Sequence, residues 1–443
     1  MPAHLEFDFA FDRTGRVAAS GPMRLLLLAD FSADSLIARG PLAARATQQV
    51  DFDNLDEVLA RFGPRLAGGE VGFESIEDFH PDALYSRLAQ FEAMRQARES
   101  EPEAGPGLLG QLLGGAVKAA PAQAPAQGID ALIRSVVAPH IVPDRAAQVQ
   151  AHQLAVDAAI SEQMRKLLHD PSFQALEAAW RGVHWLMSNL ELNEDLELHL
   201  LDVTRDELLA DLIQAQGKFE QTGLHHALVG RHGDRLGNWS ALLGLYQFGA
   251  SDQDVGLLAA LGLVASKAGG PFLAGGDPAL ASSEVTDLTG WPALRRSEAS
   301  PWIGLAAPRF LLRLPHGKSS DPVEGFKFEE FDAMPVHEEF LWGNPVLALG
   351  LLIGRAFTAR GWEFEPGDLR EIGDLPAFSV QIDGQAQLQA CSEYFFGEEA
   401  AQAMLATGLM PLVSHRHRNA LTVPRFQSVA SPAGRLAGFD GRA

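Results

Sequence analysis

The segment MRLLLLADF, residues 23–31, constrains the fold of this sequence more than any other feature. It is an apolar run of strand length that shows no regular alternation between apolar and polar positions. A strand of this kind is buried on both faces and belongs in the centre of a covered sheet. The chain must therefore fold around a sheet that has other elements packed against both of its faces.

Strands alternate with helices along the rest of the chain. Strand-like segments are predicted at residues 71–76, 196–203, 239–248, 269–276 and 309–315. Helical periodicity or helix-forming composition predicts helices at residues 52–62, 82–99, 144–190, 205–215, 251–269 and 343–361. This alternation indicates an α/β (α+β mixed) fold, in which a mixed sheet is flanked by helices.

Residues 101–128 interrupt this pattern, because ten of the 28 are Gly or Pro and seven are Ala. Such a composition is typical of a linker between domains. We therefore predict one domain at residues 1–100 and a second at residues 129–428. Residues 429–443 are small and rich in Gly, and we expect them to form a flexible tail.

A strictly alternating segment, HLEFDFAF, occupies residues 4–11 near the start of the chain. Leu5, Phe7, Phe9 and Phe11 share one side, while polar residues or alanine occupy the other. This period of two predicts a strand with one buried face. The four apolar side chains are candidates for contact with another sheet.

Composition limits the classes of partner. The formal net charge is −22 at pH 7, which argues against nucleic acids and anionic membranes as main partners. No apolar run reaches the roughly 18 residues that a membrane-spanning helix needs, and the first residues do not resemble a secretory signal. The single cysteine, Cys391, cannot form an internal disulfide. We therefore expect a cytoplasmic protein.

Several short motifs suggest metal or phosphate binding, but each lacks a required part. GPGLLG (105–110) lies in the predicted linker instead of between a strand and a helix, and GKSS (317–320) has no glycine five positions earlier. HEEF (337–340) lacks the second histidine of a metalloprotease motif. The pairs at 225–226 and in HRHR (415–418) have no cysteine or carboxylate at ligand spacing. We predict no cofactor and no metal.

Two single residues, Asp30 and Cys391, are candidates for catalysis. Asp30 follows the central apolar strand, a position where α/β enzymes place catalytic carboxylates, but an aspartate there also starts turns. Cys391 has no basic residue near it in the sequence, which favours a buried thiol over a nucleophile. No complete catalytic set is present, and we predict that the protein is not an enzyme.

The segment from His169 to Leu190 predicts a helix with a broad apolar stripe. The stripe consists of Phe173, Leu176, Trp180, Val183 and Met187. Glu177 and Arg181 are four residues apart, in the order that favours an ion pair on a helix. An acid–base pair of Glu177 with His184 is conceivable, but a salt-bridged rim beside a core stripe explains the same residues.

This helix resembles the signature helix of the large sheath subunit of type VI secretion systems, TssC or VipB. The resemblance continues in the same order over about residues 144–428, through LHLLDVTRDELLADL, GLYQFGASDQDVGLLAALGLVASKAGGPFLAG and SPWIGLAAPRFLLRLPHG. It includes FLWGNPVLALGLLIGRAFTARGW, which contains Trp342, Gly343 and Asn344. The family-signature positions expected in the core are Phe173, Leu176, Trp180, Met187 and these three residues.

Residues 4–98 are similar to a different protein, the small sheath subunit TssB or VipA. The matching parts include HLEFDFAF, MRLLLLADFS and VDFDNLDEVLARFGPRL. The chain therefore resembles a fusion of both subunits through the predicted linker, with the two halves sharing one core. A tether raises the effective concentration of the second half to roughly millimolar.

The resemblance implies a structural role. Sheath heterodimers of this family stack into a contractile tube around an inner tube, and an unfoldase recycles them. Strand exchange joins their protomers, and Leu5, Phe7, Phe9 and Phe11 suit that role.

The chain ends soon after PRFQSVASP, without the family's further C-terminal segment. We expect a component that associates with sheath, baseplate or cap and does not form a long sheath alone. The alternative is an accessory protein that binds authentic sheath subunits or their unfoldase. Inner-tube proteins are further possible partners.

Overall fold

The computed structural model describes residues 21–66, 71–99, 145–231, 239–282, 290–331, 336–382 and 385–439. The chain forms two compact units, each drawn from separate stretches of sequence. The first consists of Met1–Ile76, Pro171–Leu314 and Val336–Ala443, and the second of Glu77–Asp170 and Pro315–Pro335. These bounds differ from those of the two expected domains, since each unit takes residues from both sides of 101–128.

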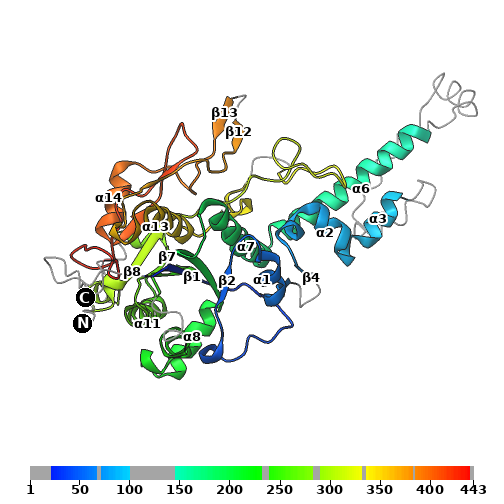
Figure 1. Cartoon of the computed structure of the whole chain (residues 1–443). Coiled ribbons are helices and arrows are strands. Elements are labelled where there is room, and N and C mark those ends of the chain that lie inside the picture. Colours follow the sequence, from blue (N-terminus) through cyan, green and yellow to red (C-terminus); the bar gives the residue numbers. More distant parts are fainter. Residues whose placement is uncertain are drawn as a thin grey trace, which may run out of the picture. The chain divides into compact units, whose positions relative to one another are not determined.

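The first unit is built on a seven-stranded sheet with the strand order β14-β8-β7-β6-β1-β5-β2. All neighbouring strands are parallel except β2, which is antiparallel to β5. The strands are β1 (Met23–Ala29), β2 (Gln48–Val50), β5 (Leu196–Asp202), β6 (Ala241–Phe248), β7 (Phe272–Gly276), β8 (Ile303–Ala307) and β14 (Leu409–Pro411). The sheet and its flanking helices confirm the predicted α/β fold (Figure 1).

Strand β1 lies inside this sheet, with β5 on one side and β6 on the other. Its pairing with β5 runs along its whole length, from Met23 opposite Leu196 to Ala29 opposite Asp202. The four leucines that follow Arg24 are each 0% exposed. The prediction of a central strand from the continuous apolar run is therefore confirmed.

Helices cover both faces of the sheet. Those of the first unit are α1 (Leu55–Phe62), α7 (Pro171–Asn189), α8 (Arg205–Gln214), α9 (Gly223–His225), α11 (Asp252–Ala268), α12 (Gly290–Leu294), α13 (Val346–Arg360) and α14 (Glu398–Ala406). Figure 1 shows α7 and α13 on one side of the sheet and α8 and α11 on the other. This two-sided cover explains why β1 carries leucines on both of its faces.

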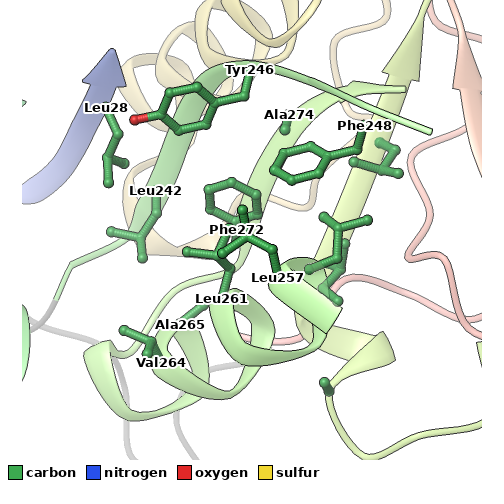
Figure 2. Packing of buried hydrophobic residues seen from close by; sticks show 14 of the residues in the cluster. Leu28, Leu242, Tyr246, Phe248, Leu257, Leu261, Val264, Ala265, Phe272 and Ala274 are labelled. Carbon is green, nitrogen blue, oxygen red and sulfur yellow. The ribbon is translucent and has the colours of Figure 1, made fainter. Parts of the chain in front are cut away.

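Successive residues of β6 show how the two faces are packed. Leu242 belongs to the cluster that α11 covers, together with Leu257, Leu261 and Phe272 (Figure 2). Leu243, the next residue, points to the opposite face, where its Cδ1 lies 2.7 Å from the position of a Cβ added to Gly350 of α13. The helix can approach the sheet this closely because position 350 has no side chain.

Smaller sheets of two or three strands complete the first unit. They are β3 (Arg65–Leu66) with β4 (Val71–Gly72), β9 (Phe310–Leu311) with β10 (Trp342–Gly343), β12 (Ser379–Ile382) with β13 (Gln385–Leu388), and β11 (Glu371–Ile372) and β15 (Val413–Ser414) with β16 (Leu421–Thr422).

Among the helices of the described residues, none combines the length and the hydropathy that a membrane-spanning segment needs.

The second unit contains α2 (Pro81–Arg87), α3 (Glu92–Glu99) and α6 (Arg145–Leu168). A single helix predicted over residues 82–99 is therefore wrong. The chain is extended at Leu88, with φ −80° and ψ 132°, which ends α2. The Arg95 guanidinium donates a hydrogen bond to the Leu88 carbonyl at 3.2 Å, so the interrupted backbone keeps a polar partner.

The long helical stretch predicted at 144–190 is also divided. Helix α6 ends at Leu168 and α7 begins at Pro171. Proline lacks the backbone N–H that a continuous helix would need at this position, and it is well suited to the first turn of a new helix. The helix predicted from His169 to Leu190 is therefore confirmed as α7, although the unbroken stretch is not.

The flexible tail expected after residue 428 is wrong for residues 429–439. The Val429 N–H donates to the Ile303 carbonyl at 2.9 Å, and the Ala437 N–H donates to the Pro301 carbonyl at 2.9 Å. Leu436 is 3% exposed. This segment packs against the start of β8, because its few apolar side chains fill the core and its backbone finds hydrogen-bond partners there.

Trp180 of α7 connects this helix to the segment after β1 and to α1. It is 0% exposed, and its indole N–H donates to the Phe31 carbonyl at 2.9 Å. Its ring centroid lies 5.3 Å from that of Phe31 and 5.9 Å from that of Phe62. One side chain thus contacts the segment after β1 and the end of α1.

We predict that Trp180→Ala lowers the free energy of unfolding by about 3–5 kcal/mol, because it removes a fully buried aromatic ring and leaves a cavity. His184→Ala on the same helix is the control and is expected to cost less than about 1 kcal/mol. Urea denaturation followed by tryptophan fluorescence and circular dichroism measures both variants. Equal losses for the two substitutions would contradict the assigned core position.

Candidate functional site

The residues expected to exchange strands cannot be placed. Leu5, Phe7, Phe9 and Phe11 lie outside the residues that the structure describes, as does the predicted linker at 101–128. Their role in strand exchange stays a prediction. The described residues instead place the other candidates on α7, along the carboxyl edge of the sheet, and around β10.

The family-signature positions lie in or beside the core. Phe173, Leu176, Trp180 and Met187 of α7 are each at most 2% exposed, and Trp342 is 6% exposed. The Asn344 amide donates to the Tyr246 carbonyl at 3.0 Å, while its oxygen accepts from the Val346 N–H at 3.0 Å. Asn344 therefore ties the start of α13 to β6.

Glu177 is not a rim residue, which corrects the interpretation of α7. Its side chain is 0% exposed, whereas that of Arg181 is 22% exposed. The predicted pair is present, with Arg181 Nε 2.6 Å from Glu177 Oε1. Arg313 adds a second contact, since its Nε lies 2.8 Å from the same oxygen. Two guanidinium groups compensate the cost of burying this carboxylate.

His184 also lies on α7, and its pairing with Glu177 as acid and base stays a hypothesis. Its ring meets the edge of Phe52, with centroids 6.3 Å apart. Sequence reasoning missed Arg313 because 136 residues separate it from Glu177. The arrangement holds α7 to the segment after β9 and has the features of a structural ion pair.

Asp202, at the end of β5, is the centre of a polar network along the carboxyl edge of the sheet. Its carboxylate accepts from the Phe31 N–H at 2.8 Å and from the Ser32 hydroxyl at 2.6 Å. Arg39 Nε lies 3.0 Å from the same group, whose side chain is 5% exposed. Burial raises the pKa of Asp202, an effect that the Ser32 hydroxyl and Arg39 oppose.

Glu207 extends this network at the first turn of α8. Thr204 and Glu207 form a reciprocal capping box, and the Glu207 carboxylate lies 3.0 Å from both Arg39 and Arg45. Burial acts to raise the pKa of Glu207, but hydrogen bonds from Arg45 and the Thr204 backbone outweigh it and hold the pKa below its usual value. The network thus connects residues 30–45 with residues 202–207.

A cleft of about 780 Å³ lies beside this network, lined by residues that follow β1 and β5, by the later residues of β6 and by Trp342. The carboxyl edge of a parallel sheet is where α/β proteins bind ligands. Here its charged groups serve structural contacts. Asp30 accepts the Ala33 N–H at 2.8 Å, which confirms the turn interpretation, and Arg205 pairs with Asp254.

Arg309, also at this cleft, binds Glu393, whose Oε1 lies 2.6 Å from Arg309 Nη2. His337 Nε2 lies 3.0 Å from the same oxygen. Burial acts to raise the pKa of Glu393, but Arg309 and His337 lower it below its usual value. The His337 ring stacks against Trp342 and against Tyr394, at centroid distances of 5.1 and 5.2 Å. HEEF is therefore part of a packed aromatic group.

The remaining candidates also have structural surroundings. Cys391 is buried, and burial raises the pKa of its thiol, as expected for a core cysteine. His415 of HRHR contacts the Thr422 hydroxyl at 2.7 Å. Within the described ranges, one group has the geometry to bind a metal. It consists of His80, His316 and Asp321, and sequence reasoning missed it.

Comparison with known proteins gives two family matches. The family described as VipB, EvpB/VC_A0108, tail sheath N-terminal domain, matches residues 150–430. The family described as type VI secretion system, VipA, VC_A0107 or Hcp2, matches residues 12–101. Because the first match spans more than half of the chain, the chain belongs to the VipB tail-sheath family. Both resemblances inferred from the sequence are confirmed.

A curated relative is the type VI secretion system sheath protein TssC1 of Pseudomonas aeruginosa, strain PAO1, which is 31% identical over 304 residues. The alignment covers 63% of this chain, which spans 61% of the length of that relative. A chain from the cryo-EM structure of the anti-feeding prophage baseplate is 11% identical, with a TM-score of 0.35. That alignment covers 97% of this chain and 69% of the other.

We predict that Asp202→Ala lowers the free energy of unfolding by about 3 kcal/mol, because it leaves Arg39 and the Phe31 N–H without their buried acceptor. The expected loss lies at the lower end of the range for breaking a buried ion pair, because Arg39 keeps its ion pair with Glu207. Asp206→Ala is the matched control, as the Asp206 side chain is 94% exposed, and it is expected to change stability by no more than about 0.5 kcal/mol. Urea titration measures both, and a neutral Asp202→Ala would contradict the network's role.

Proposed function

We propose that this chain is a non-enzymatic structural component of a type VI secretion apparatus, in which one polypeptide supplies both sheath-type halves of a protomer. The position of β1 carries the proposal. This strand lies in the part that matches the VipA family, and both of its neighbours, β5 and β6, lie in the part that matches the VipB family. Neither part can complete the central sheet without the other.

Contacts outside the sheet support the same conclusion. Trp180 of the VipB-like part packs on Phe31 and Phe62 of the VipA-like part. Asp202 and Glu207 bind Arg39 across the same division. A covalent connection between such halves favours their pairing by raising their effective concentration.

The proposed absence of catalysis is supported by the use of the candidate groups. Asp30 holds a turn, Glu177 is enclosed by arginines, and Cys391 is a buried thiol whose pKa is raised. Each of these groups serves packing or ion pairing. The expected cytoplasmic location stays a prediction.

We further propose that the chain associates with sheath-type subunits of the same apparatus. Support comes from membership in the tail-sheath family and from the sheath protein named among its relatives. Attachment to the sheath, the baseplate or the cap, and contacts with inner-tube proteins or an unfoldase, stay predictions.

The test combines negative-stain electron microscopy with co-sedimentation. We expect the purified chain alone to form no long tubes, and to pellet with sheaths assembled from separate full-length subunits, where gold labelling locates it on the tube or at its end. Sheaths without the chain, and the chain without sheaths, are the controls.

Long regular tubes of the chain alone would contradict its expected dependence on other subunits. Failure to pellet, combined with binding to unassembled subunits or to the unfoldase, would favour the accessory role. Failure to bind any sheath component would contradict the proposal.

A further inference from the structure

Three side chains of the second unit converge where the segment Pro315–Pro335 meets the start of α2. His80 precedes α2, while His316 and Asp321 come from that segment. One nitrogen or oxygen from each residue lies within 4.8 Å of those of the other two. His316 is 1% exposed, so this group is built into the folded unit and is not a chance meeting of surface side chains.

Both histidines lie close to the Asp321 carboxylate. His316 Nδ1 lies 2.9 Å from Asp321 Oδ2, and His80 Nε2 lies 3.7 Å from Asp321 Oδ1. In a tetrahedral zinc site with metal–ligand bonds of about 2.0–2.1 Å, ligand atoms are roughly 3.3 Å apart. The two observed distances, which end on different oxygens of Asp321, lie on either side of that value.

The two imidazole rings lie close to each other without stacking. The centroids of His80 and His316 are 5.0 Å apart, and the ring planes are perpendicular. Edge-to-face rings can direct one nitrogen each toward a common point beside Asp321. The remaining coordination position would belong to water, because the Asp321 side chain is 49% exposed and the group opens to solvent on that side.

Asp82 provides the outer support that metal-binding histidines require. His80 Nδ1 accepts the Asp82 N–H at 3.2 Å, and it lies 3.6 Å from Asp82 Oδ2. A metal on Nε2 places the histidine proton on Nδ1, where the Asp82 carboxylate becomes its acceptor. Carboxylates in this position orient ligating histidines and increase their basicity. The exchange gives up the hydrogen bond that caps the start of α2.

Further carboxylates hold the segment that carries the ligands. Asp82 accepts the N–H groups of Glu324 and Gly325 at 3.0 and 2.8 Å. Glu330 accepts the His316 N–H at 2.7 Å, which fixes the backbone beside the buried ring. These acidic groups also favour a cation at the centre of the cluster.

We propose that His80, His316 and Asp321 bind a zinc ion, which joins the segment Pro315–Pro335 to the start of α2. Two imidazoles and one carboxylate are ligands that zinc prefers, whereas calcium and magnesium prefer oxygen ligands alone. Zinc binds deprotonated ligands, so it competes with protons for these side chains and its binding weakens at lower pH.

The test uses the full chain without a histidine tag, treated with EDTA and then titrated with zinc chloride. We expect native mass spectrometry to show one zinc per chain, and calorimetry at pH 7.5 to show binding that weakens at pH 5.5. Zinc should raise the melting temperature of the chain and slow proteolysis within residues 315–331.

His80→Ala and Asp321→Asn are the variants of choice, because both side chains reach solvent whereas His316 is buried. We expect each to weaken zinc binding at least about tenfold and to remove the thermal shift. His417→Ala in HRHR is the control and should bind zinc as the unaltered chain does. Circular dichroism confirms that each variant is folded.

Absence of a one-to-one zinc complex of the unaltered chain would overturn the proposal, whether or not the variants fold. Equal zinc affinity of folded His80→Ala and the unaltered chain would also overturn it. Loss of binding in His417→Ala alone would move the zinc to HRHR and contradict the assignment.

Discussion

The burial of β1 between β5 and β6 is the constraint on which the rest of this structure depends. Its four consecutive leucines are 0% exposed, within a sheet that helices cover on both faces. Full burial of such side chains is worth about 1.5–3 kcal/mol each before ordering costs. A sheet without this strand would have a gap at its centre, with two unpaired strand edges exposed to solvent.

The polar groups at the carboxyl edge follow from this placement. Once β1 and β5 pair in parallel, Phe31 and Ser32 come next to Asp202, and the chain after them brings Arg39 toward Glu207. An edge that in many α/β proteins serves a ligand is here occupied largely by ion pairs between the two halves of the chain. We interpret this edge of the sheet as a contact surface that holds the two halves together, which is consistent with membership in a sheath family.

Much of this fold could be predicted from local sequence. The uninterrupted apolar run identified β1 as central, and helical spacing identified α7 and its buried stripe. Prediction failed where distant residues decide the outcome. Glu177 is buried because Arg313 compensates its charge across 136 residues. Residues 429–439 are ordered because β8 offers partners to their backbone, although their composition is typical of a tail. β8 itself, IGLAA, is short and contains Gly and Ala, so it gave no strand signal.

The most direct test of the shared sheet is to separate the halves covalently. A site for a specific protease is introduced within residues 101–128, and the purified chain is cleaved and then analysed by size-exclusion chromatography, with the uncut chain as reference. A shared sheet centred on β1 predicts that the two fragments elute together, in equal amounts, at the position of the uncut chain. Elution of the fragments as separate folded species would contradict a core that both halves must complete.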